Sequence, residues 1–292
     1  MRIYEQCELA PGLFYIGNPV AQSFLIKGAK SALVDCGMSG NGPMMLEGVR
    51  HYLGDGKLLD FNLLTHSHFD HCGATPYLKR KIPNLRVCAS KVADDVFKNP
   101  RAIELIRSLN KPLEDALGNG EEVFFTGLSV DRILKDNDVL DLGGGITVTV
   151  LEVPGHTRCS LAYWIMPQEA IAFGEAGGVP DFEGGINAEF LTSYRLYIES
   201  LNKMSKYSPK IICFAHGGAA TGDDAKGYFE RSISSTVEFR KRIEEGLGKT
   251  PDREKLLEML GEEIYSTGRI GQPRRPFMIN LKAQIKAVAE DL

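Results

Sequence analysis

The most constraining feature of this sequence is a short polar run that directly follows an apolar one. Three histidines and one aspartate occupy the six positions 66–71. They follow the run Phe61-Asn62-Leu63-Leu64, which is typical of a short buried strand. Thr75-Pro76 then indicates the start of a helix with proline in its first turn. The pattern predicts a buried strand, a turn that carries the polar residues, and a helix.

The spacing within this run favours metal binding. In an extended segment, side chains at positions i and i+2 point to the same side, so His66 and His68 can reach one ion together. Asp70 and His71 lie beyond the strand end and can face a second ion. Neutral imidazole and carboxylate suit zinc, iron and manganese alike. Three of the six histidines of the chain fall in this run, which favours a site over a chance histidine-rich loop.

The string His66-x-His68-x-Asp70-His71 after an apolar strand resembles the metallo-β-lactamase fold superfamily. Three downstream segments have the order of that family's remaining ligands. Residues 153–157 contain His156, residues 170–177 contain Glu175, and residues 211–218 contain His216. The resemblance covers roughly residues 10 to 220 and implies an α/β fold, an αββα sandwich.

The resemblance implies a dinuclear site of two divalent ions, zinc, iron or manganese. His66, His68 and His156 would hold the first ion, and Asp70, His71 and His216 the second. A bridging hydroxide would attack the substrate, and Asp70 would orient it or accept its proton. Glu175 departs from the pattern, because the family usually has aspartate at the bridging position. Glu175 can bridge both ions or bind one, and Asp181 and Glu183 are alternatives in the same loop.

Several patterns predict how the chain is organised. Residues 13–35 read as three antiparallel strands and residues 41–53 as a helix. Residues 90–118 read as a helical insertion punctuated by prolines, and residues 188–206 as a helix that includes Tyr194, a candidate substrate contact. The predicted domains are a core over residues 1–220 and a helical appendage over residues 221–292.

Composition narrows the function classes. A net charge of -4 does not favour nucleic-acid binding, which calls for a basic surface. The first residues lack an apolar signal core and no run is long enough to span a bilayer, so we expect a cytoplasmic protein without membrane contact. The six cysteines are scattered, which favours reduced, buried thiols; Cys72 and Cys159 lie near the predicted ligands, and ligation by either stays open.

We therefore expect a dinuclear hydrolase of a small-molecule ester, thioester or lactone that uses metal-bound hydroxide. The layout also resembles dinuclear thioesterases of the quinolone-signal response type, through Asp70 to Gly73, the insertion, His216-Gly217-Gly218 and the appendage. The alternatives are a regulatory or sensor protein with a vestigial or ligand-binding site, a phosphodiesterase, and a mono-iron persulfide dioxygenase. The expected partner is a small-molecule substrate, and the sequence allows a homodimer.

The last sequence hypothesis concerns residues 267–277, where two glycines and two prolines predict a loop rather than a helix. Arg274 and Arg275 stand between the two prolines. If the loop folds over the site, either arginine could hold an anionic group of the substrate through paired hydrogen bonds. The alternative is a solvated surface loop.

Overall fold

The fold is described by a computed structural model that covers residues 1–54, 59–181, 183–250, 252–269 and 271–291. The chain divides into two compact units, which are described separately below. The first unit contains residues 1–152, 159–174 and 209–226. The second contains residues 153–158, 175–208 and 227–292. No helix of the described ranges is both long and apolar enough to cross a membrane.

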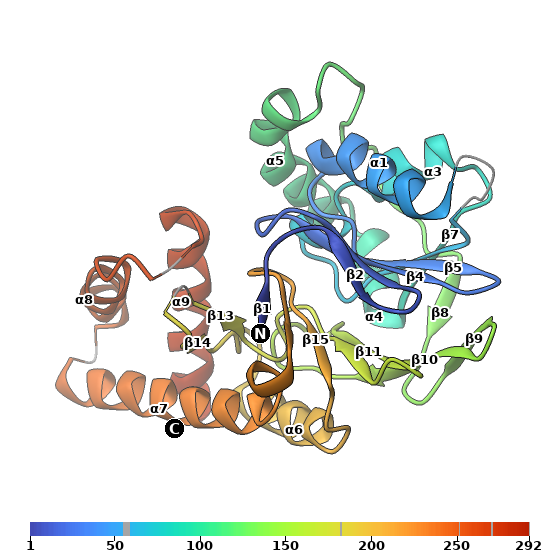
Figure 1. The fold of residues 1–292 in the computed structure, drawn as a ribbon. Coiled ribbons are helices and arrows are strands. Elements are labelled where there is room, and N and C mark those ends of the chain that lie inside the picture. The colour runs from blue at the N-terminus through green and yellow to red at the C-terminus, as the bar shows by residue number, and fades with distance from the viewer. Residues whose placement is uncertain (55–58, 182, 251, 270, 292) are drawn as a thin grey trace. The chain divides into compact units, whose positions relative to one another are not determined.

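The first unit contains two seven-stranded sheets (Figure 1). One has the strand order β2-β3-β4-β5-β6-β7-β8, with bounds Cys7–Ala10, Leu13–Gly17, Gln22–Lys27, Ser31–Val34, Phe61–Leu63, Arg86–Ser90 and Arg132–Leu134. Strands β3, β4 and β5 are antiparallel neighbours, which confirms the predicted opening meander. Strand β6, which precedes the histidine run, pairs in parallel with both β5 and β7. The run therefore begins at the carboxyl edge of this parallel part.

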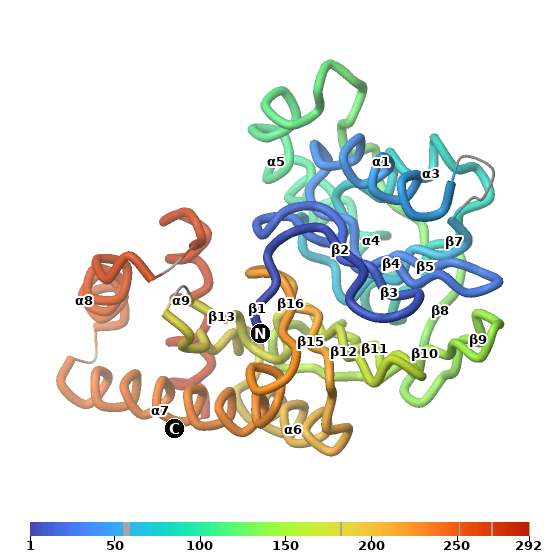
Figure 2. Tube along the Cα trace, in the orientation of Figure 1, coloured from blue at the N-terminus to red at the C-terminus, as the bar shows by residue number. Residues whose placement is uncertain are grey.

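The other sheet has the order β1-β16-β15-β12-β11-β10-β9. In chain order, its strands are β1 (Arg2–Ile3), β9 (Val139–Gly143), β10 (Ile146–Glu152), β11 (Leu161–Met166), β12 (Ala170–Ala172), β15 (Ile211–Cys213) and β16 (Ala219–Thr221). The first strand of the chain, β1, pairs with β16, as the trace in Figure 2 also shows. Strands β12 and β15 are parallel neighbours, so the segments that lead to Glu175 and to His216 leave the sheet at the same edge.

A buried apolar core lies between the two sheets. Strand β3 shows how the sequence builds it, because successive side chains of a strand point to opposite faces. Leu13 and Tyr15 belong to the core cluster shared by the two sheets, whereas Phe14 and Ile16 pack against helices on the other face. Both faces of this sheet are therefore covered, which explains why Leu13 to Ile16 of β3 are apolar at successive positions rather than at alternate ones.

Helices of the first unit cover the outer face of the β2–β8 sheet (Figure 1). They are α1 (Gly42–Leu53), α2 (Phe69–Cys72), α3 (Thr75–Lys81), α4 (Lys91–Phe97) and α5 (Pro100–Leu117). Helices α4 and α5 occupy the predicted insertion, but Pro112 lies inside α5 and does not interrupt it. Ile106 and Leu113 pack against apolar clusters of the unit, and this burial outweighs the backbone hydrogen bond that the proline removes.

In its described residues the second unit contains the short strand pair β13 (Val179–Pro180) and β14 (Ile186–Asn187) and four helices. The helices are α6 (Tyr194–Ser205), α7 (Tyr228–Lys249), α8 (Arg253–Tyr265) and α9 (Arg274–Asp291). The prediction of a helix from residue 188 was wrong, because α6 begins at Tyr194. Ser193 caps α6 by accepting a hydrogen bond from the backbone N–H of Leu196, and residues 188–193 are not helical.

The predicted loop over residues 267–277 was also partly wrong. Helix α9 begins at Arg274, so Arg274 and Arg275 belong to its first turn, together with Pro276. Proline is tolerated there because the first N–H groups of a helix have no partner within the helix. Ile270, which is part of the predicted loop, lies outside the described residues. The predicted domain boundary near residue 220 stays a prediction.

Candidate metal centre

The first unit gathers five predicted ligands at the carboxyl edge of β6 and around the end of β15. The ring centroids of His66 and His68 lie 4.5 Å apart, and those of His66 and His71 lie 4.1 Å apart. His216 reaches the same group, with its Nε2 3.5 Å from Oδ2 of Asp70. The ligand atoms of Asp70, His71 and His216 all lie within 4.8 Å of one another. The structure therefore brings these five residues together.

A buried carboxylate supports two of these histidines. Asp35 follows β5 in a left-handed backbone conformation, with φ of 55°, which aspartate tolerates better than most residues. Its Oδ1 accepts the Thr65 N–H at 2.8 Å, and its Oδ2 accepts the Thr65 hydroxyl at 2.7 Å and His71 Nδ1 at 2.9 Å. Thr65 Oγ1 in turn lies 3.0 Å from His66 Nδ1. One carboxylate therefore orients His71 directly and His66 through Thr65.

The second unit holds the other two predicted ligands side by side. His156 Nε2 lies 3.5 Å from Glu175 Oε2, and both side chains are buried. His156 Nδ1 lies 2.7 Å from the backbone carbonyl of Glu189. Tyr197 donates its hydroxyl proton to the carbonyl of Glu175 at 3.1 Å. A histidine and a carboxylate are thus held with their ligand atoms facing each other.

The hydrogen bonds of the histidines test whether this donor set fits a metal ion. His71, His156 and His216 place Nδ1 against an oxygen that can only accept: the Asp35 carboxylate, the Glu189 carbonyl and the Val20 carbonyl. Thr65 gives its own proton to Asp35, so its oxygen accepts from His66 Nδ1. In the neutral form, each of these four rings therefore carries its proton on Nδ1, which makes Nε2 the atom that would bind a metal. This is the usual arrangement of histidines that bind a metal ion.

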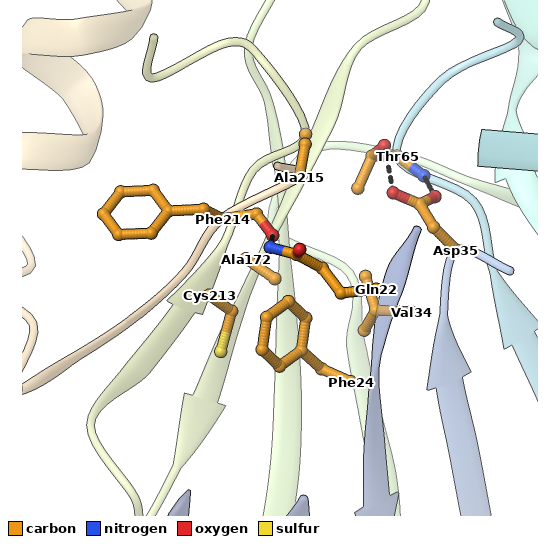
Figure 3. A pocket seen from close by; sticks show the side chains of 10 residues that line it. Gln22, Phe24, Val34, Asp35, Thr65, Ala172, Cys213, Phe214 and Ala215 are labelled. Atoms are coloured by element: carbon orange, nitrogen blue, oxygen red, sulfur yellow. Dashed lines mark hydrogen bonds between the residues drawn. The ribbon is translucent and has the colours of Figure 1, made fainter. Parts of the chain in front are cut away.

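A small cavity lies between the sheets of the first unit beside the supporting carboxylate (Figure 3). Asp35 and Thr65 line one part of it, and Gln22 lines another. Gln22 is buried and donates its amide to the carbonyls of Phe214 and Gly218, which fixes the segment that leads to His216. None of the predicted ligands lines this cavity, which is too small for a substrate.

The cysteines near the histidine run are buried thiols. Cys72 Sγ lies 3.7 Å from the Ser67 carbonyl, and Cys159 Sγ lies 3.4 Å from the Ser67 hydroxyl. Burial raises the pKa of the Cys72 thiol well above its usual value, and the pKa of Cys36, also in this unit, rises to about 12 for the same main reason. A metal binds the thiolate, so these values favour packing over ligation for Cys72.

The predicted substrate contacts all lie in the second unit. The ring of Tyr194 packs edge-on against Phe190, with a centroid distance of 5.4 Å, and the Arg240 guanidinium lies 4.3 Å from the Tyr194 ring centroid. Arg274 is exposed and forms an ion pair of 2.8 Å with Glu262 of α8. Arg275 is exposed in the first turn of α9. Contact of these three side chains with a substrate stays a prediction.

Sequence reasoning missed three groups that support the ligands: Asp35, Thr65 and the Glu189 carbonyl. Asp35 could have been found from the sequence, because it is an acidic residue directly after strand β5, whose last three residues are apolar. Thr65 immediately precedes the first ligand. No sequence signal identifies the Glu189 carbonyl, because sequence patterns carry no information about the partner of a backbone oxygen. The segment was also expected to be helical.

Comparison with known proteins agrees with this picture. The sequence is 28% identical over 185 residues to the metallo-beta-lactamase fold-containing protein ST1585 of Sulfurisphaera tokodaii, covering 60% of this chain and 67% of the relative. It is 30% identical over 141 residues to a hydroxyacylglutathione hydrolase of Rippkaea orientalis, covering 48% of this chain. The match spans only 43% of the length of that hydrolase.

Solved structures share the fold over nearly the whole chain. The structure of ST1585 from Sulfolobus tokodaii has a TM-score of 0.60 at 20% identity and covers 97% of this chain and 99% of its own. TTHA1429 of Thermus thermophilus, a metallo-beta-lactamase family protein, has a TM-score of 0.66 at 18% identity, with coverages of 97% and 95%. The predicted fold class, with its C-terminal helical part, is thereby confirmed.

The family assignment comes from the sequence model. The Metallo-beta-lactamase superfamily model matches residues 17–216, well over half of the chain. This match extends from the first sheet to His216 and includes each predicted ligand. The closer similarity to the quinolone-signal response type stays a prediction. The chain belongs to the metallo-β-lactamase superfamily.

Proposed function

We propose that the protein is a metal-dependent hydrolase that cleaves an ester, thioester or lactone bond in a small molecule. In this proposal His66, His68 and His156 hold one divalent ion, and Asp70, His71 and His216 hold a second. Glu175 would bind one of these ions or both. The observation that carries the proposal is the hydrogen bonding of four histidines through Nδ1, which leaves each Nε2 as a donor to a metal.

Chain connectivity supports the inclusion of Glu175. Gly174, its neighbour in sequence, belongs to the first unit and packs so closely on the histidine run that a Cβ there would lie 2.8 Å from Thr65 Oγ1 and 3.2 Å from His66 Nδ1. Gly174 has φ of 57°, a conformation that glycine adopts without strain. Glu175 follows Gly174 directly and consecutive Cα atoms are about 3.8 Å apart, so chain connectivity allows Glu175 to join the predicted ligands of the histidine run.

Chain connectivity supports His156 in the same way. It precedes by three residues Cys159, whose Sγ lies 3.4 Å from the Ser67 hydroxyl and whose carbonyl accepts the Ser90 hydroxyl at 2.9 Å. Three residues span at most about 11 Å. Chain connectivity therefore allows His156 to share the first metal set with His66 and His68.

The chemistry follows from the roles of these residues. When bound, two divalent ions polarise a carbonyl or phosphoryl oxygen and lower the pKa of a water molecule. Asp70 is partly exposed, with its Oδ2 3.5 Å from His216 Nε2, so it can take up a proton at the mouth of the site. Asp35 and Thr65 hold His71 and His66 in the binding tautomer throughout. The partly exposed Asp70 and His216 mark the side from which a substrate enters.

The ester and thioester class is favoured by one relative. The hydroxyacylglutathione hydrolase is named for the hydrolysis of an acylglutathione, which is a thioester. Glu175 is compatible with this class, because a longer carboxylate can still reach two ions or bind one of them. We therefore place thioesters first, lactones and other esters second, and phosphodiesters third among the substrates to be tried.

The proposal is tested with a panel of thioesters, lactones, esters and phosphodiesters, using protein loaded with zinc, iron or manganese. Asp70→Asn should abolish turnover of whichever substrate is found and leave the fold intact, since it removes one ligand charge and the proton acceptor. Asp94→Asn is the matched control: Asp94 is also mostly buried and pairs with Lys98 at 2.6 Å, but it lies on α4. Wild-type turnover by Asp70→Asn, or no turnover by any loaded wild-type protein, would contradict the proposal.

A further inference from the structure

The C-terminal helix α9 contacts the segment that orients His156. Gln284 of α9 donates its side-chain amide to the Ala188 carbonyl at 2.5 Å, and Asn280, one turn earlier, donates to Glu189 Oε2 at 3.3 Å. Gln284 is only 4% exposed. Buried amides of this kind are kept where they satisfy a specific partner, because an unsatisfied one costs stability. The two amides hold consecutive residues of the non-helical segment 188–193.

The peptide group that joins Ala188 to Glu189 is fixed at both ends. Gln284 binds its carbonyl, and the Tyr197 hydroxyl accepts its N–H at 3.3 Å. The same hydroxyl donates its own proton to the Glu175 carbonyl at 3.1 Å. The following carbonyl, that of Glu189, then accepts from His156 Nδ1 at 2.7 Å. A continuous series of hydrogen bonds thus joins Gln284 to His156.

The His156 loop is docked tightly against the same elements. A Cβ on Gly155, which has φ of 132°, would lie 2.4 Å from the Tyr197 backbone, so only glycine fits. The Gly155 carbonyl accepts the Thr192 N–H at 2.9 Å, and Ser200 of α6 donates to the Pro154 carbonyl at 2.7 Å. Because the loop backbone is fixed on one side and the Glu189 carbonyl on the other, the imidazole has one hydrogen-bonded orientation.

Helix α9 is itself anchored by apolar packing within the second unit. Leu281, Ile285 and Val288 are almost wholly buried and recur at the spacing of one helix face. Gln284 lies on this face, between Leu281 and Val288 in sequence. Apolar packing of the helix alone does not require a polar side chain in the middle of this buried face. Its partner, the Ala188 carbonyl, explains why it is there.

We propose that Gln284, assisted by Asn280, is a positioning residue that sets the ring orientation of His156 through the Ala188–Glu189 peptide. The C-terminal helix thereby determines metal affinity at the set that contains His156. This inference rests on the proposed role of His156 as a ligand. It assigns to α9 a task distinct from substrate contact by its first turn.

The test compares Gln284→Met with Val288→Ala. The first removes the donor and keeps a long side chain, whereas the second removes buried packing one turn later on the same helix and leaves the hydrogen bond. In metal-free protein, nitrogen-15 imidazole spectra should show His156 with its proton on Nδ1 in wild type and in Val288→Ala. Gln284→Met should show a mixture of tautomers and faster exchange of the Nδ1 proton.

Metal affinity is the second readout, measured by cobalt titration in a His216→Ala background that leaves the His66, His68 and His156 set. Loss of a direct partner of a ligand costs about 10 to 100-fold in affinity, so one step further out we expect about tenfold for Gln284→Met. Val288→Ala should stay within about twofold. Equal losses in the two variants, or a wild-type tautomer and affinity in Gln284→Met, would overturn the inference.

Two further results are decisive. If Gln284→Met does not fold, Asn280→Ala replaces it, because Asn280 is only half-buried; a shift in the His156 tautomer supports the inference and no shift overturns it. If the wild-type protein binds no cobalt, the proposed function fails. The tautomer spectra of the metal-free protein still decide whether Gln284 orients His156.

Discussion

The Asp35→Asn variant tests how much the supporting carboxylate contributes to metal affinity, because it leaves the predicted ligands unchanged. Asp35 accepts three hydrogen bonds, from the Thr65 N–H, the Thr65 hydroxyl and His71 Nδ1. Asparagine has one acceptor oxygen and an NH₂ group. If its oxygen stays with Thr65 N–H, the NH₂ faces His71 Nδ1, which must then give up its proton to become an acceptor. The proton moves to Nε2 and blocks the atom that would bind metal.

The magnitude follows from these contacts. Removal of a direct partner of a ligating histidine costs about 10 to 100-fold in metal affinity, or about 1.4–2.8 kcal/mol. Asp35 supports His71 directly and His66 through Thr65, so we expect the upper end, about 100-fold, for the set that contains His71. The set that contains His66 should weaken less, by about tenfold, because Thr65 can still accept from His66 Nδ1.

The assay is competition for zinc against a chromophoric chelator, with two dissociation constants fitted for each protein. Asp94→Asn again serves as the control, since it replaces another buried carboxylate of the first unit and should keep both constants. Thermal unfolding of the metal-free proteins checks that each variant is folded. Two zinc constants in Asp35→Asn that equal those of wild type would refute the reasoning that Asp35 fixes the histidine tautomers.

Three further predictions concern other parts of the chain. Glu175→Ala should lower metal stoichiometry and activity while Glu175→Asp retains both, as measured by elemental analysis; an unchanged Glu175→Ala would make Glu175 a bystander. Burial raises the pKa of the Cys88 thiol from 9.0 to about 11, so the unfolded chain loses this proton first and stability should fall as pH rises from about 9 to 11. Urea unfolding should show a shallower alkaline loss in Cys88→Ala, and an identical slope would contradict this. Arg274→Ala and Arg275→Ala should raise KM for an acidic substrate more than for a neutral analogue; equal effects on both would leave the start of α9 as plain surface.

The grouping of the candidate ligands could be predicted from sequence because histidine and carboxylate side chains recur there at a fixed spacing. His66 and His68 alternate along an extended segment, and Asp70 and His71 follow the turn, so period and residue type were sufficient. His156 follows β10, which alternates threonine with branched apolar residues, and His216 follows the apolar strand β15, so both were expected beyond a strand end. The strands of the first sheet were equally predictable, since their apolar runs are bounded by turn residues.

The errors arose where tertiary packing decides local structure. Pro112 was expected to interrupt a helix, but α5 continues past it because neighbouring apolar side chains of the helix are packed against the core. Arg274 was placed in a loop because of the flanking prolines, although a proline in the first turn of a helix costs little. The segment 188–193 has helical periodicity, yet it is held in a non-helical conformation by hydrogen bonds to Gly155 and Gln284, which are distant in sequence.

The central claim is that this chain holds two metal ions between its histidines and carboxylates. Elemental analysis of protein produced with zinc, iron and manganese available tests it most directly. The account predicts two transition-metal ions per chain in wild type and a reduced content in His156→Ala and in His216→Ala. Less than one ion per wild-type chain, even after reconstitution of the metal-free protein, would contradict it.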